Sequence, residues 1–131
     1  FSDIADGASN TIFLGERTNG NAVYRNRDMV IPPNGWPAGD NRNWNTGTAW
    51  IDLYKAEQGI IGSNYDGTQP NGGPCAINCS NLPQSGFYSW HPGGVHIALL
   101  DGSARFLGET VDKHVFASLI TYAGGEVIGE F

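Results

Sequence analysis

The chain has 131 residues, a net charge of −6 at neutral pH and 15% charged residues. The negative charge argues against nucleic acid as a partner, because phosphate backbones require a basic footprint. No stretch approaches the roughly 20 apolar residues of a membrane-spanning helix, so we expect no membrane contact from this segment. A chain of this length suits a single domain, which we predict over residues 1–131. The high glycine content (19 residues) is typical of a loop-rich secreted domain.

The first half of the chain predicts short strands separated by long loops. A turn at Asp6-Gly7 precedes a strand at 11–14, which Glu16 follows as a surface or paired charge. Residues 18–45 are rich in Asn, Gly and Pro, which predicts irregular loops with one strand near 29–31.

The middle of the chain continues this alternation of strands and turns. Strands are expected at 48–54, at 59–62 and at 87–90, because apolar and aromatic residues cluster there. Tyr65-Asp66-Gly67 is the clearest turn between them.

A β-hairpin is the strongest local prediction. Apolar strands at 95–100 and 103–107 flank Asp101-Gly102, a pair that suits a two-residue type I′ turn. That turn would place Leu100 opposite Ser103, with the Asp101 side chain bonded to its own turn. The resulting apolar face would consist of Val95, Ile97, Leu99, Ala104 and Phe106.

A helix is predicted after the hairpin, over residues 111–123. Thr110 would cap it, and Gly124-Gly125 would end it before a last strand at 126–128. The predicted fold class is therefore α+β, with mainly antiparallel sheet, one C-terminal helix and long loops.

The two cysteines, Cys75 and Cys79, predict a disulfide if the chain is exported. A zinc site is the less favoured alternative, because it would need two further ligands and no histidine lies nearby in sequence.

Other ligand sites are weaker predictions. The hairpin register keeps His91 away from Asp101, so we expect His91 to bond to backbone and lock the bend at residues 91–94, with a metal role as the alternative. Acidic, amide-rich loops offer oxygen ligands for calcium, and the candidate ligands are Asp3, Asp6 and Asn10. Otherwise no cofactor is expected.

Tryptophans beside Asn and Asp could stack on sugar rings, and the candidates are Trp36, Trp44 and Trp50. A hydrolase is disfavoured, because no Gly-x-Ser-x-Gly nucleophile elbow is present, and we predict that the chain is not an enzyme.

His91, nine residues, and then Asp101-Gly102 form a spacing that resembles the signature of the prepilin-type, processing-associated family. Members of that family are also catalogued as extracellular solute-binding-like proteins. Further segments match in the family's order: DGASNTIFLGER at 6–17, GPCAINCSN at 73–81, SWHPGG at 89–94, DGSARFL at 101–107 and AGGEV at 123–127.

The resemblance implies a pilin- or pseudopilin-like C-terminal domain located outside the cytoplasm or on the cell surface. Family members begin with a prepilin leader and a long apolar helix, so we interpret this chain as the C-terminal part of a longer protein. Its expected function is that of a non-enzymatic module in a surface fibre or type II secretion-like assembly. Its expected partners are other copies or pilin-like subunits. The alternative is an extracellular carbohydrate- or solute-binding module.

Overall fold

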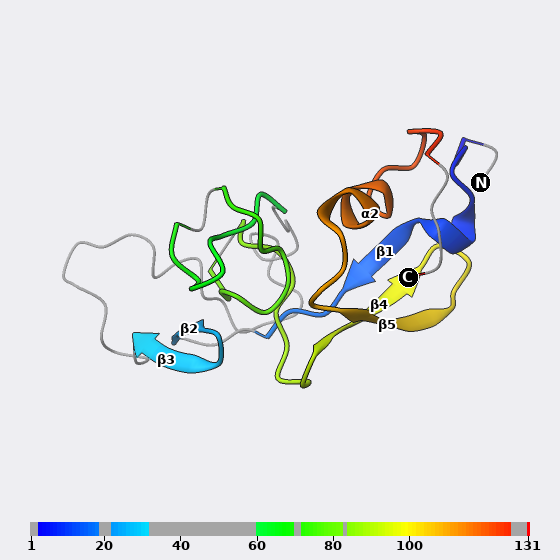
Figure 1. Cartoon of the computed structure of the whole chain (residues 1–131). Helices are drawn as coiled ribbons and strands as arrows, with labels where there is room; N and C mark the ends of the chain where they lie inside the picture. Colours follow the sequence, from blue (N-terminus) through cyan, green and yellow to red (C-terminus); the bar gives the residue numbers. More distant parts are fainter. Residues whose placement is uncertain (1–2, 19–21, 32–59, 70–71, 83, 127–130) are drawn as a thin grey trace. The chain divides into compact units, whose positions relative to one another are not determined.

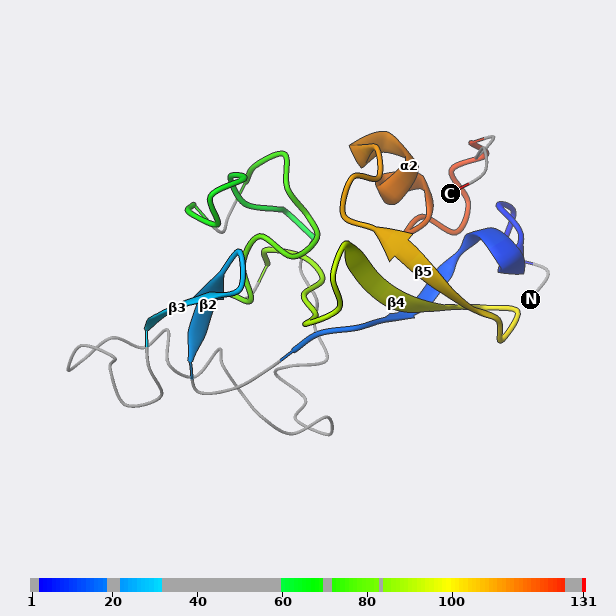
Figure 2. The ribbon, with the colours of Figure 1, turned by 60° about the horizontal axis from the view of Figure 1, so that its bottom comes forward.

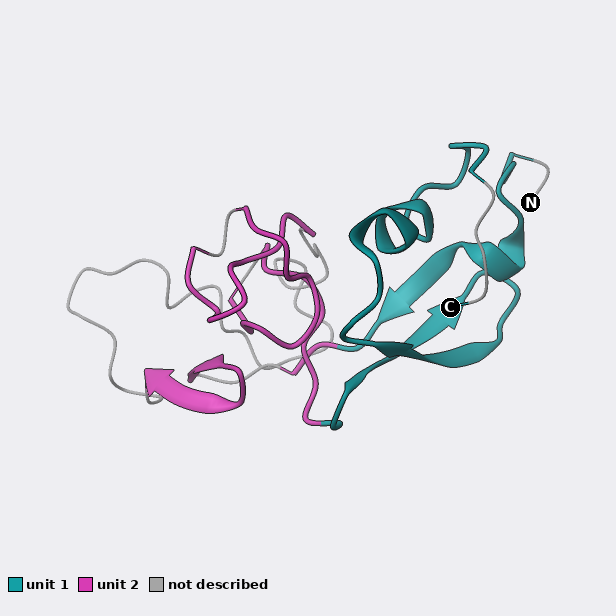
Figure 3. Ribbon diagram, viewed as in Figure 1, with its two compact units in different colours: residues 1–16, 91–131 teal, residues 17–90 magenta. Residues whose placement is uncertain are grey.

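The chain divides into two compact units, which Figure 3 distinguishes by colour. Unit 1 combines residues 1–16 with residues 91–131, and unit 2 comprises residues 17–90. The prediction of a single domain stays a prediction. The computed structural model describes residues 3–18, 22–31, 60–69, 72–82, 84–126 and 131.

Unit 1 is built on a three-stranded antiparallel sheet in the order β1-β4-β5 (Figure 1). β1 (Ile12–Gly15) confirms the predicted N-terminal strand and follows the short 3₁₀ helix η1 (Ala8–Asn10). β4 (Gly94–Leu99) is the central strand, and β5 (Ala104–Gly108) returns along its other edge. The sheet thus joins two sequence segments that lie about 80 residues apart, as the bond between Glu16 and His96 illustrates.

The hairpin of β4 and β5 is confirmed, but its predicted register is wrong by one residue. Leu99 donates its N–H to Ser103 O (2.8 Å) and accepts from Gly102 N (3.0 Å), which encloses a three-residue loop. Gly102 has φ +85°, whereas Asp101 is not among the residues with positive φ. A type I′ turn needs positive φ at both central residues, so this loop is instead a type I turn followed by a left-handed glycine.

This one-residue shift changes which side chains of β5 are buried. His96 lies opposite Phe106 and Val95 opposite Leu107, so Phe106 is 46% exposed whereas Leu107 is 1% exposed. The prediction that Ala104 and Phe106 share the buried face of β4 is therefore wrong, since a slip of one residue exchanges the faces of a strand. The buried apolar side chains of the sheet are Val95, Ile97, Leu99 and Leu107.

The C-terminal helix α2 (Lys113–Ser118) lies over one face of this sheet (Figures 1 and 2). It is shorter than predicted, and Asp112 caps it in place of Thr110. The Asp112 carboxylate accepts bonds from His114 N (2.8 Å) and Val115 N (3.3 Å), as an N-cap side chain should. Phe116 of the helix and Leu119, its C-cap residue, are 3% and 0% exposed, so both belong to the core of unit 1.

The segment after α2 forms turns that bond to the N-terminal part of unit 1. The Asp6 carboxylate accepts hydrogen bonds from Gly124 N (2.8 Å) and Gly125 N (2.6 Å). Glu126 does not lie in a strand, and the rest of the strand predicted at 126–128 lies outside the described residues.

Unit 2 contains a two-stranded antiparallel hairpin of β2 (Val23–Arg25) and β3 (Asp28–Ile31), which confirms the strand expected near 29–31. The described residues 60–62 and 87–90, where strands are expected over 59–62 and 87–90, form only isolated bridges, such as Ile77 with Phe87. The strand expected at 48–54 lies outside the described residues.

Buried polar groups hold the loops of unit 2 in place. Asn81 is 2% exposed, accepts a bond from Tyr24 N (2.9 Å) and donates one to Ala22 O (3.0 Å). Because one side-chain amide satisfies two backbone groups, it substitutes for a regular strand at this position.

The fold class is α+β, with antiparallel sheets, one short C-terminal helix and extensive loops, as predicted. Within the part of the chain that the structure describes, no helix is long and apolar enough to cross a membrane.

Candidate metal centre

Three side chains of unit 1, Glu16, His91 and His96, converge at the end of β1. His91 Nε2 lies 3.1 Å from Glu16 Oε1, and His96 Nδ1 lies 3.5 Å from Glu16 Oε2. One ligand atom from each residue can be chosen so that all three atoms lie within 4.8 Å of one another. The group therefore has the spacing of ligands that could share one ion.

The pairing of β1 with β4 positions Glu16 against His96. Gly15 lies opposite Ile97 in the sheet, so Glu16 continues β1 beside His96. Glu16 N donates to His96 O (3.0 Å), and His96 N donates to Glu16 Oε2 (3.0 Å). The second bond orients the Glu16 carboxylate toward β4, because one of its two oxygens accepts the His96 N–H.

The bend at residues 91–94 delivers His91 to the same place. Gly93 adopts φ +84°, and its carbonyl accepts a bond from Glu109 N (2.8 Å). Gly94 packs so tightly that an added Cβ would collide with the Leu107 carbonyl oxygen and lie 2.8 Å from the Phe106 ring. The Gly93–Glu109 bond therefore ties the bend to the end of β5, and position 94 has no room for a side chain.

Ring contacts orient the two imidazoles. The rings of His91 and His96 meet edge to face, with centroids 4.6 Å apart, and the His96 ring also meets Phe106 at 5.2 Å. The side chains of Glu16, His91 and His96 are 32%, 49% and 55% exposed, so solvent reaches the group.

Two imidazole nitrogens and a carboxylate form a donor set used by zinc and by non-haem iron(II). Calcium and magnesium prefer oxygen ligands alone. Without a metal, the same contacts make a carboxylate that bridges two histidines.

The structure corrects the sequence-based account of His91. Its imidazole contacts the Glu16 carboxylate, so its role is not restricted to bonding backbone in the bend. Sequence reasoning tested Asp101 as the acidic partner and interpreted Glu16 as a surface or paired charge. Glu16 is indeed paired, but only the β1–β4 register reveals with which residues.

Asp101 bonds to its own turn as predicted, whereas Gly102 has a positive φ but belongs to a three-residue turn in place of the predicted type I′ turn. Asp101 Oδ1 accepts from Ser103 N (2.8 Å), and hydrogen bonds from Ser103 hold the pKa of this carboxyl below its usual value. His114, the third histidine, lies on α2 and does not belong to the group of three.

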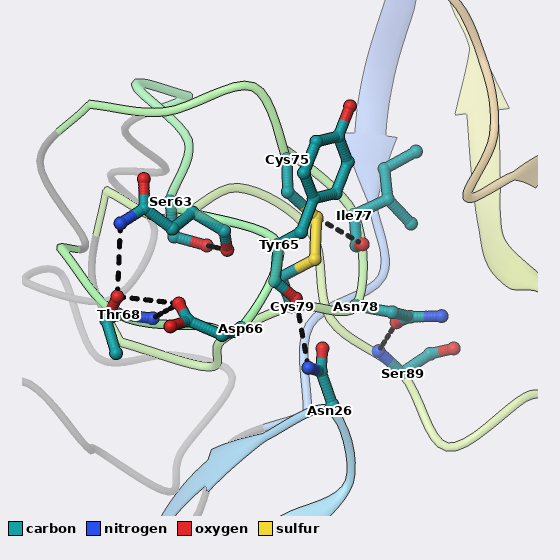
Figure 4. Close-up of a disulfide and its surroundings, with 11 residues drawn as sticks. Asn26, Ser63, Tyr65, Asp66, Thr68, Cys75, Ile77, Asn78, Cys79 and Ser89 are labelled. Carbon is teal, nitrogen blue, oxygen red and sulfur yellow. Dashed lines mark hydrogen bonds between the residues drawn. A yellow bond between two sulfur atoms is a disulfide. The ribbon is translucent and has the colours of Figure 1, made fainter.

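The predicted disulfide between Cys75 and Cys79 is present in unit 2 (Figure 4). The Cys79 carbonyl accepts a bond from Asn26 N (3.1 Å), which ties the disulfide loop to the β2–β3 hairpin. The nearby turn at Asp66 is also as predicted, and bonds from the Thr68 hydroxyl and N–H lower the pKa of Asp66.

Two of the sequence candidates for calcium, Asp6 and Asn10, make hydrogen bonds within unit 1. Asp6 bonds to the C-terminal backbone, and Asn10 Nδ2 donates to the Asp6 carbonyl (3.1 Å). Calcium binding at Asp3, Asp6 and Asn10 stays a prediction. Trp36, Trp44 and Trp50 lie outside the described residues.

Comparison with known proteins identifies a family but no characterised relative. No curated protein and no solved structure matches the chain. A family model described as "Protein of unknown function (DUF1559)", with the short name SBP_bac_10, matches residues 1–114. The short name hints at an extracellular, solute-binding-like protein. Because the match covers most of the sequence, the chain belongs to the DUF1559 family.

Proposed function

We propose that this chain is a non-enzymatic, pilin-like module of a surface fibre or type II secretion-like assembly outside the cytoplasm. The observation that carries the proposal is the exposed apolar face of unit 1. Leu14 is 60% exposed and Phe106 46% exposed, and both belong to strands of the β1-β4-β5 sheet.

The strand register places these apolar residues together. Leu14 lies opposite Ala98, and Ala98 lies opposite Ala104, so one row of apolar side chains crosses all three strands. Phe106 lies on the same face of β5 as Ala104, because alternate residues of a strand share a face. We call this surface, whose apolar residues are Leu14, Ala98, Ala104 and Phe106, the open face. It also carries His96, which lies opposite Phe106.

An apolar sheet face exposed to water favours a protein partner. Another copy of the chain or a related pilin-like subunit would remove the open face from water. The net charge of −6 supports a protein partner over nucleic acid.

The disulfide supports a location outside the cytoplasm, since structural disulfides persist in oxidising compartments. The short name of the family points the same way.

Sedimentation velocity at micromolar concentration tests the proposal. The wild-type chain should associate reversibly, and the double variant Leu14→Ser/Phe106→Ser should sediment as a monomer. Tyr122→Ser is the matched control, because Tyr122 is 62% exposed and lies outside the sheet, so this variant should associate like the wild type.

A monomeric wild type that excludes a hydrophobic dye would contradict the proposal. Equal loss of association in the Tyr122→Ser control would mean that the open face is not the contact surface.

The alternative, carbohydrate or solute binding, draws support from an aromatic group in unit 2. Trp90 is 48% exposed, and its ring meets Tyr24 (centroids 4.7 Å apart) and Tyr88 (5.9 Å) edge to face. An exposed indole held by two tyrosines offers a surface on which a sugar ring can stack.

A glycan array probed with the wild type and with Trp90→Ala distinguishes this alternative. Binding that is lost in Trp90→Ala, by a chain that remains monomeric, would favour the binding module over the fibre subunit.

A further inference from the structure

We propose that Glu16, His91 and His96 bind a borderline divalent cation of the zinc type. The proposal concerns side chains of unit 1 alone. It does not require fibre assembly, although His96 lies beside Phe106 on the open face. It rests on three observations: the donor set, the donor spacing and the contacts of the supporting backbone.

The donor set selects the class of metal. Two imidazole nitrogens and one carboxylate suit Zn²⁺, Cu²⁺, Ni²⁺ and Co²⁺, whereas Ca²⁺ and Mg²⁺ take oxygen ligands. All three residues expose their side chains in part, so an ion can enter from solvent.

The spacing is close to that of zinc ligands. Zinc bonds of about 2.0–2.1 Å in tetrahedral geometry place the donor atoms about 3.4 Å apart. His91 Nε2 lies 3.1 Å from Glu16 Oε1, His96 Nδ1 lies 3.5 Å from Glu16 Oε2, and one donor atom from each of the three residues lies within 4.8 Å of the others. Side-chain movement that brings these atoms closer together would direct the three ligands at one ion.

The backbone holds the ligands in place before an ion arrives. The His96 N–H binds Glu16 Oε2 (3.0 Å), so the carboxylate already points along β4. The Phe106 ring meets the His96 imidazole, and the close packing at Gly94 fixes the bend that carries His91. In known metal sites, hydrogen bonds to the ligating side chains hold them in the orientation that binds the metal.

Three protein ligands leave one tetrahedral position open to water or to an external donor. The bound ion would connect the end of β1 to the bend before β4. Because the ion binds the folded form, it should raise the melting temperature of unit 1.

Isothermal titration calorimetry of the full chain with zinc chloride, after removal of any histidine tag, is the primary test. We expect one equivalent to bind, with calcium chloride giving no competing heat.

Each ligand has a conservative variant. Glu16→Gln retains an oxygen that can accept the His96 N–H, and His91→Asn and His96→Asn remove one imidazole each. Each should weaken zinc binding by about tenfold or more, since even the loss of an outer-shell partner can have this effect. His114→Asn is the matched control and should bind zinc like the wild type, because the His114 side chain is exposed outside the group.

Cobalt(II) supplies a readout that a purely structural role would not change. The wild type should give the visible absorption of four-coordinate cobalt, and His96→Asn should lose it while its far-UV circular dichroism stays that of the wild type.

Three outcomes would overturn the proposal. The folded wild type could fail to bind zinc at micromolar concentration, which would leave Glu16 as a carboxylate that bridges two histidines. All three ligand variants could bind zinc like the wild type, or His114→Asn could lose binding, and either would place the ion elsewhere.

Discussion

Truncation of two neighbouring side chains of β5 should have very different effects on stability. Leu107 is 1% exposed, and replacing a buried leucine with alanine costs about 2–5 kcal/mol, since the loss of apolar burial adds to the cost of a cavity. Phe106 is 46% exposed. About half of its side chain is removed from water, so Phe106→Ala should cost about 1 kcal/mol. We expect the two variants to differ by about 2 kcal/mol in the free energy of unfolding of unit 1.

The assay must report on unit 1 specifically. The four tryptophans, at positions 36, 44, 50 and 90, all belong to unit 2, so tryptophan fluorescence is the wrong probe. Native-state hydrogen exchange of the amides of β4 and β5 measures the opening free energy of the sheet itself. An equal or larger loss in Phe106→Ala would refute the observed register, because a two-residue turn would bury Phe106 in place of Leu107.

Three further predictions concern other parts of the chain. Replacing both Cys75 and Cys79 with alanine should destabilise unit 2 by about 2 kcal/mol, because the disulfide closes only a short loop in the unfolded chain. Tryptophan fluorescence during denaturation measures this loss of stability. An unchanged denaturation midpoint would mean that the disulfide does not stabilise unit 2 by restricting its unfolded state. Gly102→Val should lower stability by about 1–3 kcal/mol, because φ is +85° at this position and a β-branched residue is strained there. Gly102→Asn should be tolerated better, because asparagine adopts left-handed backbone angles more readily. Equal melting temperatures for the two variants would contradict this prediction. Asp112 has a pKa lowered by the N–H groups of His114 and Val115, so its stabilising effect is present above about pH 4 and is lost as pH falls through the folded-state pKa. Asp112→Asn retains the cap acceptor, so acid denaturation followed by circular dichroism should be less steep in this variant than in the wild type, and an identical profile would exclude this contribution.

Local sequence determined the elements that depend on a few neighbouring residues. The hairpin, the turn at Asp66 and the disulfide are all predicted correctly, because turn residues and closely spaced cysteines act over a handful of positions. The predicted helix also forms, although Asp112 caps it two residues later than expected.

The register of the hairpin was beyond local reasoning. An Asp-Gly pair can form a two-residue turn, and it can equally occupy the last two positions of a three-residue turn. The φ angle of Asp101 distinguishes the two turns, because only the two-residue type I′ turn requires it to be positive. The tertiary structure selects the second arrangement, which places Leu107 opposite Val95 and buries both.

Only the tertiary structure decided the candidate metal centre. Glu16 and His96 are separated by 80 positions, and no local sequence motif around either residue predicts its contact with the other. They meet because β1 pairs with β4 in one particular antiparallel register, which the burial of a whole sheet face determines. Sequence alone therefore supplied the ligand types, and the long-range strand pairing supplied their spacing.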